Sequence, residues 1–278
     1  MTRIQEALNN ARQQAPDQLP AYQENYKKAL NLFTAIQAGR FAFEAETCFD
    51  TASILEGKTP LLPRELLLRA KDKDGQPIPP FPAIQAFKEL GLGRELDMLL
   101  VQAMIIFASK KQLFPISINI TSSAVPRSEF WDLLLQQLGQ ILGQEANQKV
   151  MFEIEANTLS SPRTHEAVLE VKKAGFKFTI DDFDPSDLGD DARANFMEIA
   201  DAVKFKGSTI QAGLKGNIDL KEIAETTRRM KPDVQLIGKW VESPNDAVKL
   251  HESFGISGAQ GRNLPNNIEA FRVAIGHD

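Results

Sequence analysis

The sequence predicts a mixed α/β fold, a modified (β/α)8 barrel of the TIM type with one antiparallel strand and an N-terminal helical extension. Two observations favour it: eight short apolar runs spread along the chain, and helical patterns in most of the connections between them. The eight runs are FAFEAETCF (41–49), RELLLRA (64–70), FPISINI (114–120), VMFEIE (150–155), FKFTIDDF (176–183), AVKFKG (202–207), VQLIGKWV (234–241) and ISGAQG (256–261).

The connections decide how these strands run. From the second run onward, segments such as 84–109, 129–143 and 161–174 carry apolar residues at the helical period. Parallel strands need crossover connections of this length, so these strands are predicted to be parallel. The link at 50–64 is too short and too rich in glycine and proline for a crossover helix, which predicts an antiparallel pair there. A doubly wound open sheet is the alternative architecture.

The first 38 residues differ from the rest, because their apolar spacing is helical and is interrupted near Pro16 to Pro20. We therefore expect two parts, an N-terminal helical extension at 1–38 and a barrel domain at 39–278. The extension either caps the open end of the barrel or binds a partner, and the sequence does not separate these alternatives.

Composition narrows the classes of partner. The 278 residues carry a net charge of -5 without a basic block, which argues against a nucleic acid as the main partner. No apolar run reaches the length of about 18 residues that a membrane span needs. The single cysteine, Cys48, lies in a predicted strand, where a core position fits it better than a nucleophilic role. We expect a cytoplasmic protein.

Polar residues interrupt or border the apolar runs, and in a barrel such strand-end residues converge on one mouth. Several carboxylates, an amide and a lysine gathered there supply oxygen ligands for Mg²⁺ or Mn²⁺ and a cation for a phosphate. Any one of these residues alone is equally well explained as an ordinary strand-end polar group. The residues are Glu46, Glu65, Asn119, Glu153, Asp181, Asp182, Lys204, Lys239 and Gln260.

The order of the motifs around these residues resembles the EAL-type cyclic di-GMP phosphodiesterases, a family of bacterial signalling proteins, over about residues 30–268. The segments that carry the resemblance are AIQAGRFAF, ELLLR, GL followed by LD, INIT, EI, IDDF, VKF, WVE and QG. One such match would be weak, but their shared order makes the resemblance specific. It implies the barrel fold and a metal-dependent phosphodiesterase site.

The resemblance also implies roles for single residues. The metal ligands would be Glu65, Asn119, Glu153 and Asp181. Asp182 and Lys204 would help to hold metal and the attacking water, and Arg69 would contact a phosphate of the dinucleotide. On the substrate side, Gln260 keeps the family's glutamine and Glu46 replaces another, although a shifted register would put Glu44 there instead.

Two lysines break the family pattern. Lys239 stands where the family has a metal-site glutamate, and Lys206 where it has an aspartate. Replacing attraction by repulsion beside a divalent ion weakens its binding by something on the order of 10 kcal/mol at an effective dielectric constant near 20. A protonated Lys239 is expected to act as a surrogate cation that bridges Glu153 and Asp181.

The loop after the fifth predicted strand is altered as well. The family's DDFGTGYSS has become DDFDPSDLG, so the glycines of this loop are lost: Asp184 cannot cheaply adopt backbone angles that suit glycine alone, and Pro185 fixes its own φ. Ala156 takes the place of the glutamate that anchors this loop in the family. Trp240 replaces a glycine beside Lys239, and we expect it to be a packing residue that narrows the pocket.

These departures predict a degenerate EAL-like domain without phosphodiesterase activity, which acts as a regulator through contacts with a protein partner. The alternatives are a receptor that binds cyclic di-GMP without cleaving it and an active metal-dependent enzyme, so the sequence leaves open whether the chain is an enzyme. No cofactor is expected unless the site is active, in which case Mg²⁺ or Mn²⁺ would be required. The sequence identifies neither the partner nor the oligomeric state.

Overall fold

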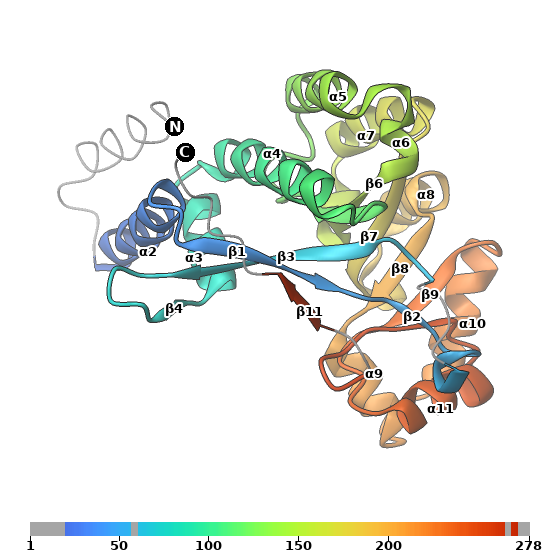
Figure 1. Ribbon diagram of the computed structural model, residues 1–278. Coiled ribbons are helices and arrows are strands. Elements are labelled where there is room, and N and C mark those ends of the chain that lie inside the picture. Colours follow the sequence, from blue (N-terminus) through green and yellow to red (C-terminus); the bar gives the residue numbers. More distant parts are fainter. Residues whose placement is uncertain (1–19, 57–60, 265–267, 272–278) are drawn as a thin grey trace. The chain divides into compact units, whose positions relative to one another are not determined.

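The computed structural model describes residues 20–56, 61–264 and 268–271 (Figure 1). The chain divides into two compact units, and the strands β1, β3 and β11 pass from one to the other. The first unit comprises residues 1–44, 66–112 and 270–278, and the second comprises 45–65 and 113–269.

The first unit contains helices and a small antiparallel pair. Helix α2 (Pro20–Gln37) packs against α3 (Pro80–Glu89), which is followed by α4 (Gly93–Lys111). Strand β3 (Arg64–Lys71) pairs antiparallel with β4 (Pro77–Ile78) around a turn that the side chain of Asp72 closes. Apolar side chains fill the space between these elements, among them Phe33, Phe43, Phe87 and Phe107.

The second unit is built on a curved sheet in the order β3-β5-β6-β7-β8-β9-β10-β2. In this spatial order, the strands β3, β5, β6, β7, β8, β9 and β10 run parallel, and β2 is antiparallel to β10. Besides β3 and β1 (Phe41–Glu46), the strands are β2 (Phe49–Asp50), β5 (Ile116–Asn119), β6 (Val150–Glu155), β7 (Lys177–Phe183), β8 (Ala202–Phe205), β9 (Gln235–Gly238), β10 (Gly258–Ala259) and β11 (Ile268–Phe271).

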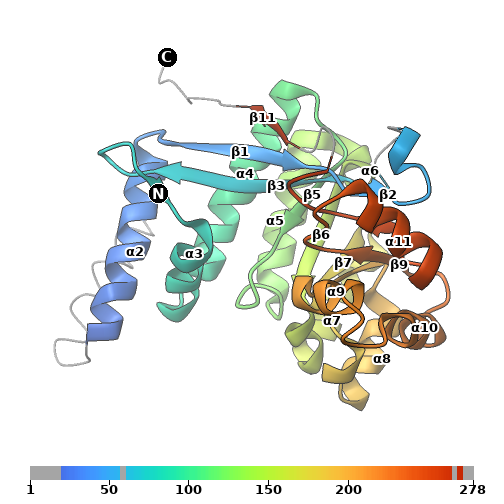
Figure 2. The same ribbon diagram turned by 90° about the horizontal axis from the view of Figure 1, so that it is seen from below.

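Helices cover the outer side of this sheet (Figures 1 and 2). They are α5 (Ser128–Leu142), α6 (Ala146–Lys149), α7 (Pro162–Lys173), α8 (Asp190–Ile199), α9 (Gly207–Leu214), α10 (Leu220–Met230) and α11 (Pro244–Phe254). Short 3-10 turns are η1 (Ile54–Glu56), η2 (Gly143–Glu145), η3 (Ala156–Ser160) and η4 (Pro185–Asp187).

An aromatic cluster joins helix to sheet. The ring of Trp131 on α5 meets Phe152 of β6 and Phe178 of β7 edge to face, and its indole N–H donates to the carbonyl of Val125. Because neighbouring strand residues point to opposite sides, turning Phe152 outward turns Glu153 inward. The same alternation holds for Phe178 and Thr179. Outer packing therefore fixes which side chains enter the barrel.

The predicted fold is confirmed. Each of the eight apolar runs contains a strand, and the crossover helices lie where their periodicity indicated. The first run is divided at Thr47 and Cys48 into β1 and β2, and β4 and β11 were not predicted. Cys48 is a buried free thiol whose pKa is raised to about 12, chiefly by burial.

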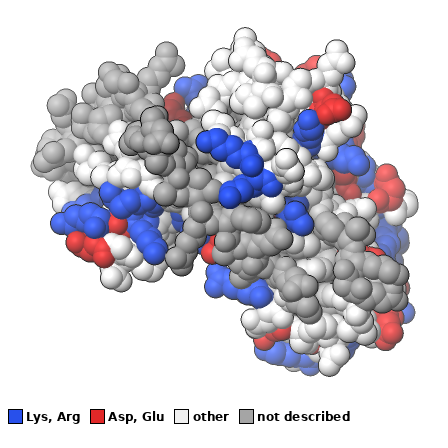
Figure 3. Space-filling model, viewed as in Figure 1, with Lys and Arg blue, Asp and Glu red and all other residues white. Residues whose placement is uncertain are grey.

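Helix α2 confirms the helix expected over 22–36, whereas the helical pattern at Ile4, Leu8 and Ala11 lies outside the described residues. Among the described residues, none of the helices combines the length and apolar character that crossing a membrane requires. On the face shown in Figure 3, basic side chains form small groups between acidic and uncharged ones.

Candidate functional site

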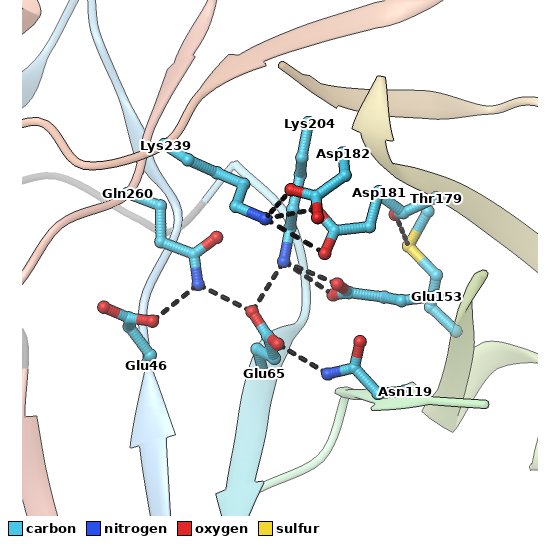
Figure 4. A network of polar contacts seen from close by, with 11 residues as sticks. Glu46, Glu65, Asn119, Glu153, Thr179, Asp181, Asp182, Lys204, Lys239 and Gln260 are labelled. Atoms are coloured by element: carbon cyan, nitrogen blue, oxygen red, sulfur yellow. Dashed lines mark hydrogen bonds and ion pairs between the residues drawn. The ribbon is translucent and has the colours of Figure 1, made fainter. Parts of the chain in front are cut away.

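Polar side chains from successive strands of the second unit meet at the carboxyl ends of the parallel strands, where barrel enzymes hold their active sites (Figure 4). They come from eight strands or the residues that directly follow them. The network comprises Glu46, Glu65, Asn119, Glu153, Asp181, Asp182, Lys204, Lys239 and Gln260. We name these residues the mouth network; all nine lie in the second unit.

Lys204 forms the inner half of the mouth network. Its Nζ lies 2.6 Å from a carboxyl oxygen of Glu65 and 2.8 and 2.7 Å from the two of Glu153. The side chains of Lys204 and Glu153 are only 3% and 1% exposed. Charges removed from water to this degree persist only when they are paired and hydrogen-bonded, and Lys204 is the partner of both carboxylates.

Two amides complete the inner half. The Asn119 side chain donates to Glu65 at 2.6 Å. The Nε2 of Gln260 donates to Glu65 at 2.7 Å and to Glu46 at 2.8 Å, so this amide joins two acidic side chains. Glu65 thus receives hydrogen bonds from one ammonium and two amides.

The two buried glutamates differ in pKa. Burial raises the pKa of Glu65, but the Lys204 ammonium and the hydrogen bonds from Lys204, Gln260 and Asn119 outweigh it and lower the value to about 2. Burial, followed by repulsion from Glu65, raises the pKa of Glu153 to about 7 despite Lys204. Burial lowers the pKa of Lys204, but Glu153, Glu65 and Asp181 together raise it well above its ordinary value. Lys204 is therefore a permanent cation.

Lys239 forms the outer half of the mouth network. Its Nζ lies 2.8 and 3.0 Å from the carboxyl oxygens of Asp181 and 2.7 Å from Asp182. Burial lowers the pKa of Lys239, but Asp181 and Asp182 raise it overall, so the ammonium is retained. Lys239 therefore places a positive charge against the carboxylates of Asp181 and Asp182.

The partners of that cation differ from the expectation. Lys239 contacts Asp181 and Asp182, and the predicted bridge from Asp181 to Glu153 is wrong. The physical reason is that Lys204 already takes both carboxyl oxygens of Glu153. Lys239 enters from the end of β9 and meets the two aspartates at the end of β7 instead.

A bulge explains how two consecutive aspartates reach one ammonium. Neighbouring residues of a regular strand point to opposite faces, but the pairing of β7 with β8 shifts register between Ile180 and Phe183. Asp182 has a φ of 49°, in the left-handed region that few residues other than glycine adopt, aspartate and asparagine more readily than most. The bulge turns both carboxylates toward Lys239.

The donor set does not fit a pair of divalent metal ions. Of the four predicted ligands, Glu65, Glu153 and Asp181 accept hydrogen bonds from an ammonium, and Asn119 turns its nitrogen toward Glu65. An ammonium group competes with a metal ion for the same oxygens and repels it. In the part of the chain that the structure describes, no group of three or more His, Cys, Asp and Glu residues is arranged to hold a metal.

Arg69 lies in the first unit and is engaged there. Its Nε donates to Glu44 at 2.7 Å, and the two side chains form an ion pair. Of the two registers left open for the first strand, Glu46 is the residue in the mouth network and Glu44 is the partner of Arg69.

Lys206 lies outside the mouth network. Its Nζ pairs with Asp187 in η4, the loop after β7. Asp184 caps that turn by accepting hydrogen bonds from the backbone N–H and hydroxyl of Ser186, and Pro185 is buried. The loop that lacks the family's glycines is therefore held by local contacts and by an ion pair of its own.

Trp240 contradicts its expected role. Its side chain is 60% exposed, so it is not a core packing residue. Its φ is 58°, which the sequence signals only through the glycine that the family has at this position. The residues that hold it, Gly207 and Gln211, were not found by sequence reasoning, because both lie in the remote helix α9.

Solved structures with similar folds support the architecture. An S helix-GGDEF-EAL structure of Vibrio cholerae LapD without ligand has a TM-score of 0.71 at 19% identity, covering 85% of this chain and 56% of that one. The FimX EAL domain from Pseudomonas aeruginosa, bound to c-di-GMP, gives 0.69 at 18% identity, covering 87% and 97%. The PaMucR phosphodiesterase complex with c-di-GMP gives 0.70 at 14% identity, also covering 87% and 97%.

These identities establish likeness of fold alone, and this chain spans little more than half of the LapD chain. No curated protein sequence matches the chain. The model of the EAL domain family, in contrast, matches residues 32–265, which include every member of the mouth network. The chain therefore belongs to the EAL domain family of cyclic di-GMP signalling proteins.

Proposed function

We propose that this EAL domain does not hydrolyse cyclic di-GMP and acts as a regulator through contacts with a protein partner. One observation carries the proposal: the ammonium of Lys239 contacts both carboxyl oxygens of Asp181 and one of Asp182. Asp181 is a metal ligand by resemblance to the family. Its oxygens are here satisfied by a group of the chain itself.

The chemistry lost with the metal explains the loss of activity. A bound divalent ion supplies an activated water and stabilises charge on the phosphate during hydrolysis. A lysine ammonium provides one positive charge with fixed donors and cannot bind a water as a Lewis acid does. The carboxylates of Glu65, Glu153, Asp181 and Asp182 accept hydrogen bonds from Lys204 or Lys239 in place of a metal ion.

The test is hydrolysis by the purified protein. Cyclic di-GMP incubated with the full chain and Mn²⁺ or Mg²⁺ should give no more linear dinucleotide than the matched variant Glu65→Ala. The proposal fails if the wild-type protein linearises cyclic di-GMP and Glu65→Ala abolishes that activity, because the chain would then be an active metal-dependent phosphodiesterase.

A receptor for cyclic di-GMP is the second candidate function. It is favoured because FimX and MucR hold c-di-GMP on the same fold. Against it stands the pairing of Arg69 with Glu44, which occupies the guanidinium that would contact a phosphate. Calorimetric titration of the full chain with cyclic di-GMP distinguishes the two, since a receptor gives heat that Arg69→Ala removes.

The division of the chain and its location belong to the same proposal. We propose a barrel domain at 39–278 preceded by a helical extension at 1–38, and a cytoplasmic site of action. Limited proteolysis followed by mass spectrometry tests the division, because cleavage should concentrate on the amino-terminal side of residue 39.

A further inference from the structure

We propose that the indole of Trp240 forms a rigid, exposed aromatic surface at the edge of the mouth network (the rim), and that this surface binds an arginine side chain of a partner protein. This inference rests on the proposed regulatory function and names the chemistry of the partner's contact. Its basis is the conformation of Trp240, the charge around it and an unpaired acceptor in the mouth network.

The backbone at Trp240 is held in an unfavourable conformation. A tryptophan at a φ of 58° costs of order 1 kcal/mol or more, so surrounding contacts must impose it. The backbone of Gln260 supplies two of these contacts. Its backbone N–H donates to the carbonyl of Gly238 at 2.9 Å, and its backbone carbonyl accepts from the N–H of Val241 at 3.0 Å. The side chain of Gln211 donates to the carbonyl of Trp240 at 2.7 Å. The residues between Gly238 and Val241 are thus fixed on two sides.

The indole is fixed as well. Its ring lies directly on Gly207, where an added Cβ would overlap the ring atoms. Gly207 begins α9 immediately after β8, so this contact lies at the carboxyl end of the strands, on the rim of the mouth. One part of the ring is covered by backbone, and the side chain nevertheless stays 60% exposed. A large aromatic surface is thus presented to solvent in one orientation.

The charge around the Trp240 indole is negative. The mouth network holds five carboxylates and two ammonium groups, and Asp182, which contacts Lys239, is 59% exposed. In the adjacent loop, Asp184 and Asp187 face one further cation, Lys206. In the outer half and this loop together, four aspartates face two lysines, so carboxylates outnumber cations there. A ligand that is positively charged is attracted there, and a phosphodiester is repelled.

An unpaired hydrogen-bond acceptor in the mouth network also favours a ligand with N–H donors. The residue Gln260 is only 5% exposed, and its Oε1 has no hydrogen-bond donor among the described residues. The amide orientation is fixed because Nε2 donates to Glu46 and Glu65. Figure 4 shows the oxygen turned toward the interior of the network. A buried acceptor of this kind is stabilised by N–H donors, which a guanidinium extending past Trp240 into the network would supply.

Arginine combines these requirements. A guanidinium is planar, stacks on an indole face, carries five donors and keeps its positive charge. A nucleobase could stack on the same ring, but the phosphates of cyclic di-GMP would enter an acidic mouth. The observations therefore favour an arginine-bearing protein segment over the dinucleotide.

The two tryptophans provide a direct measurement. A nitrogen-15 spectrum of the full chain contains one indole signal for Trp240 and one for Trp131, whose N–H is buried in a bond to Val125. The Trp240→Gly variant assigns the first signal, and the second is an internal control. The probes are the peptide acetyl-Gly-Arg-Gly-amide, the same peptide with neutral citrulline in place of arginine, and cyclic di-GMP.

The arginine peptide should shift the Trp240 signal in a saturable manner while the Trp131 signal stays fixed. Citrulline should bind at least tenfold more weakly, and Asp184→Asn should weaken the arginine peptide severalfold, whereas the control Glu170→Gln on the outer helix α7 should not. Equal shifts from arginine and citrulline, no shift from either, or a Trp240 shift with cyclic di-GMP alone would overturn the proposal. Hydrolysis of cyclic di-GMP by a chain that still binds the arginine peptide would refute the proposed function separately.

Discussion

The inner and outer halves of the mouth network each pair a lysine with two carboxylates, but they differ in burial and in backbone conformation. In the inner half, Lys204 is almost completely buried between Glu65 and Glu153. In the outer half, Lys239 is 20% exposed and meets Asp181 and Asp182 through a bulge, with left-handed backbone at Asp182 and at Trp240. By the resemblance of the sequence to the family, the inner lysine corresponds to a family lysine and the outer lysine stands where the family has a carboxylate.

The difference separates structure from function. Lys204 stabilises the fold, because without it two buried carboxylates lack a counter-ion. Lys239 is accessible to water, which screens its charge, and its removal leaves Asp181 and Asp182 at the solvent edge. The outer half is therefore where the chain could change its function at little expense in stability.

The largest predicted effect breaks the inner half. Lys204→Met should lower the free energy of unfolding by about 3–5 kcal/mol, because it leaves buried negative charge unpaired. Lys239→Met should lower it by only about 1–2 kcal/mol. Urea denaturation followed by circular dichroism measures both. Equal losses for the two variants would contradict the distinction, and adding Glu153→Gln to Lys204→Met should recover part of the loss.

The pH dependence of stability tests the inner half more finely. The folded-state pKa of Glu153, about 7, lies above its ordinary value of 4.5. Its contribution is therefore fully present below pH 4.5 and is lost as the pH rises through 7, by an amount on the order of 3 kcal/mol. For Glu65, with a pKa of about 2, the contribution is present above pH 4.5 and is lost as the pH falls through 2.

The variant Glu153→Gln isolates the first of these contributions. Between pH 4.5 and 7 its unfolding free energy should vary less steeply than that of the wild type, measured by urea denaturation at matched pH values. If the unfolding free energies of the wild type and the variant depend on pH equally across this window, Glu153 is ionised in the folded protein without penalty, and the prediction is wrong.

A double-mutant cycle tests the rigidity of the outer half. Gly207→Ala should lower the unfolding free energy by about 1–3 kcal/mol, because the new Cβ overlaps the Trp240 indole. In the Trp240→Gly background the same change should be neutral or stabilise by up to about 1 kcal/mol, because the clash is gone and alanine favours the helix. An equal loss in both backgrounds would mean that the indole does not rest on Gly207.

The smallest effect concerns the loop ion pair. Lys206 and Asp187 are 39% and 57% exposed, so Lys206→Ala should change the unfolding free energy by less than about 1 kcal/mol. A loss above 2 kcal/mol would show that Lys206 belongs to the stabilising network of the mouth, as Lys204 does.

The fold was predictable because its signals are local. Apolar runs and helical periodicity report burial directly, and all eight runs contain strands. The short strands β4 and β11 were not predicted because neither lies within one of the eight apolar runs. The break between β1 and β2 lies inside one continuous apolar run, which gave no local sign of it.

The residues of the mouth network were predictable from the polar residues that interrupt the strands. The hydrogen bonds between them were not. The sequence places Glu153, Asp181 and Lys239 at strand ends. Which ammonium meets which carboxylate depends on the bulge in β7 and on the prior occupation of Glu153 by Lys204. Trp240 was misjudged because exposure depends on its contact with Gly207, a residue 33 positions away.

Metal binding tests the central claim most directly. The electron paramagnetic resonance signal of free Mn²⁺, recorded while the full chain is added, reports how many ions leave solution. We predict that the wild-type protein leaves the signal undiminished at millimolar Mn²⁺, and that Lys239→Glu lowers it. Stoichiometric loss of the signal with the wild type, abolished by Glu65→Ala, would contradict the account.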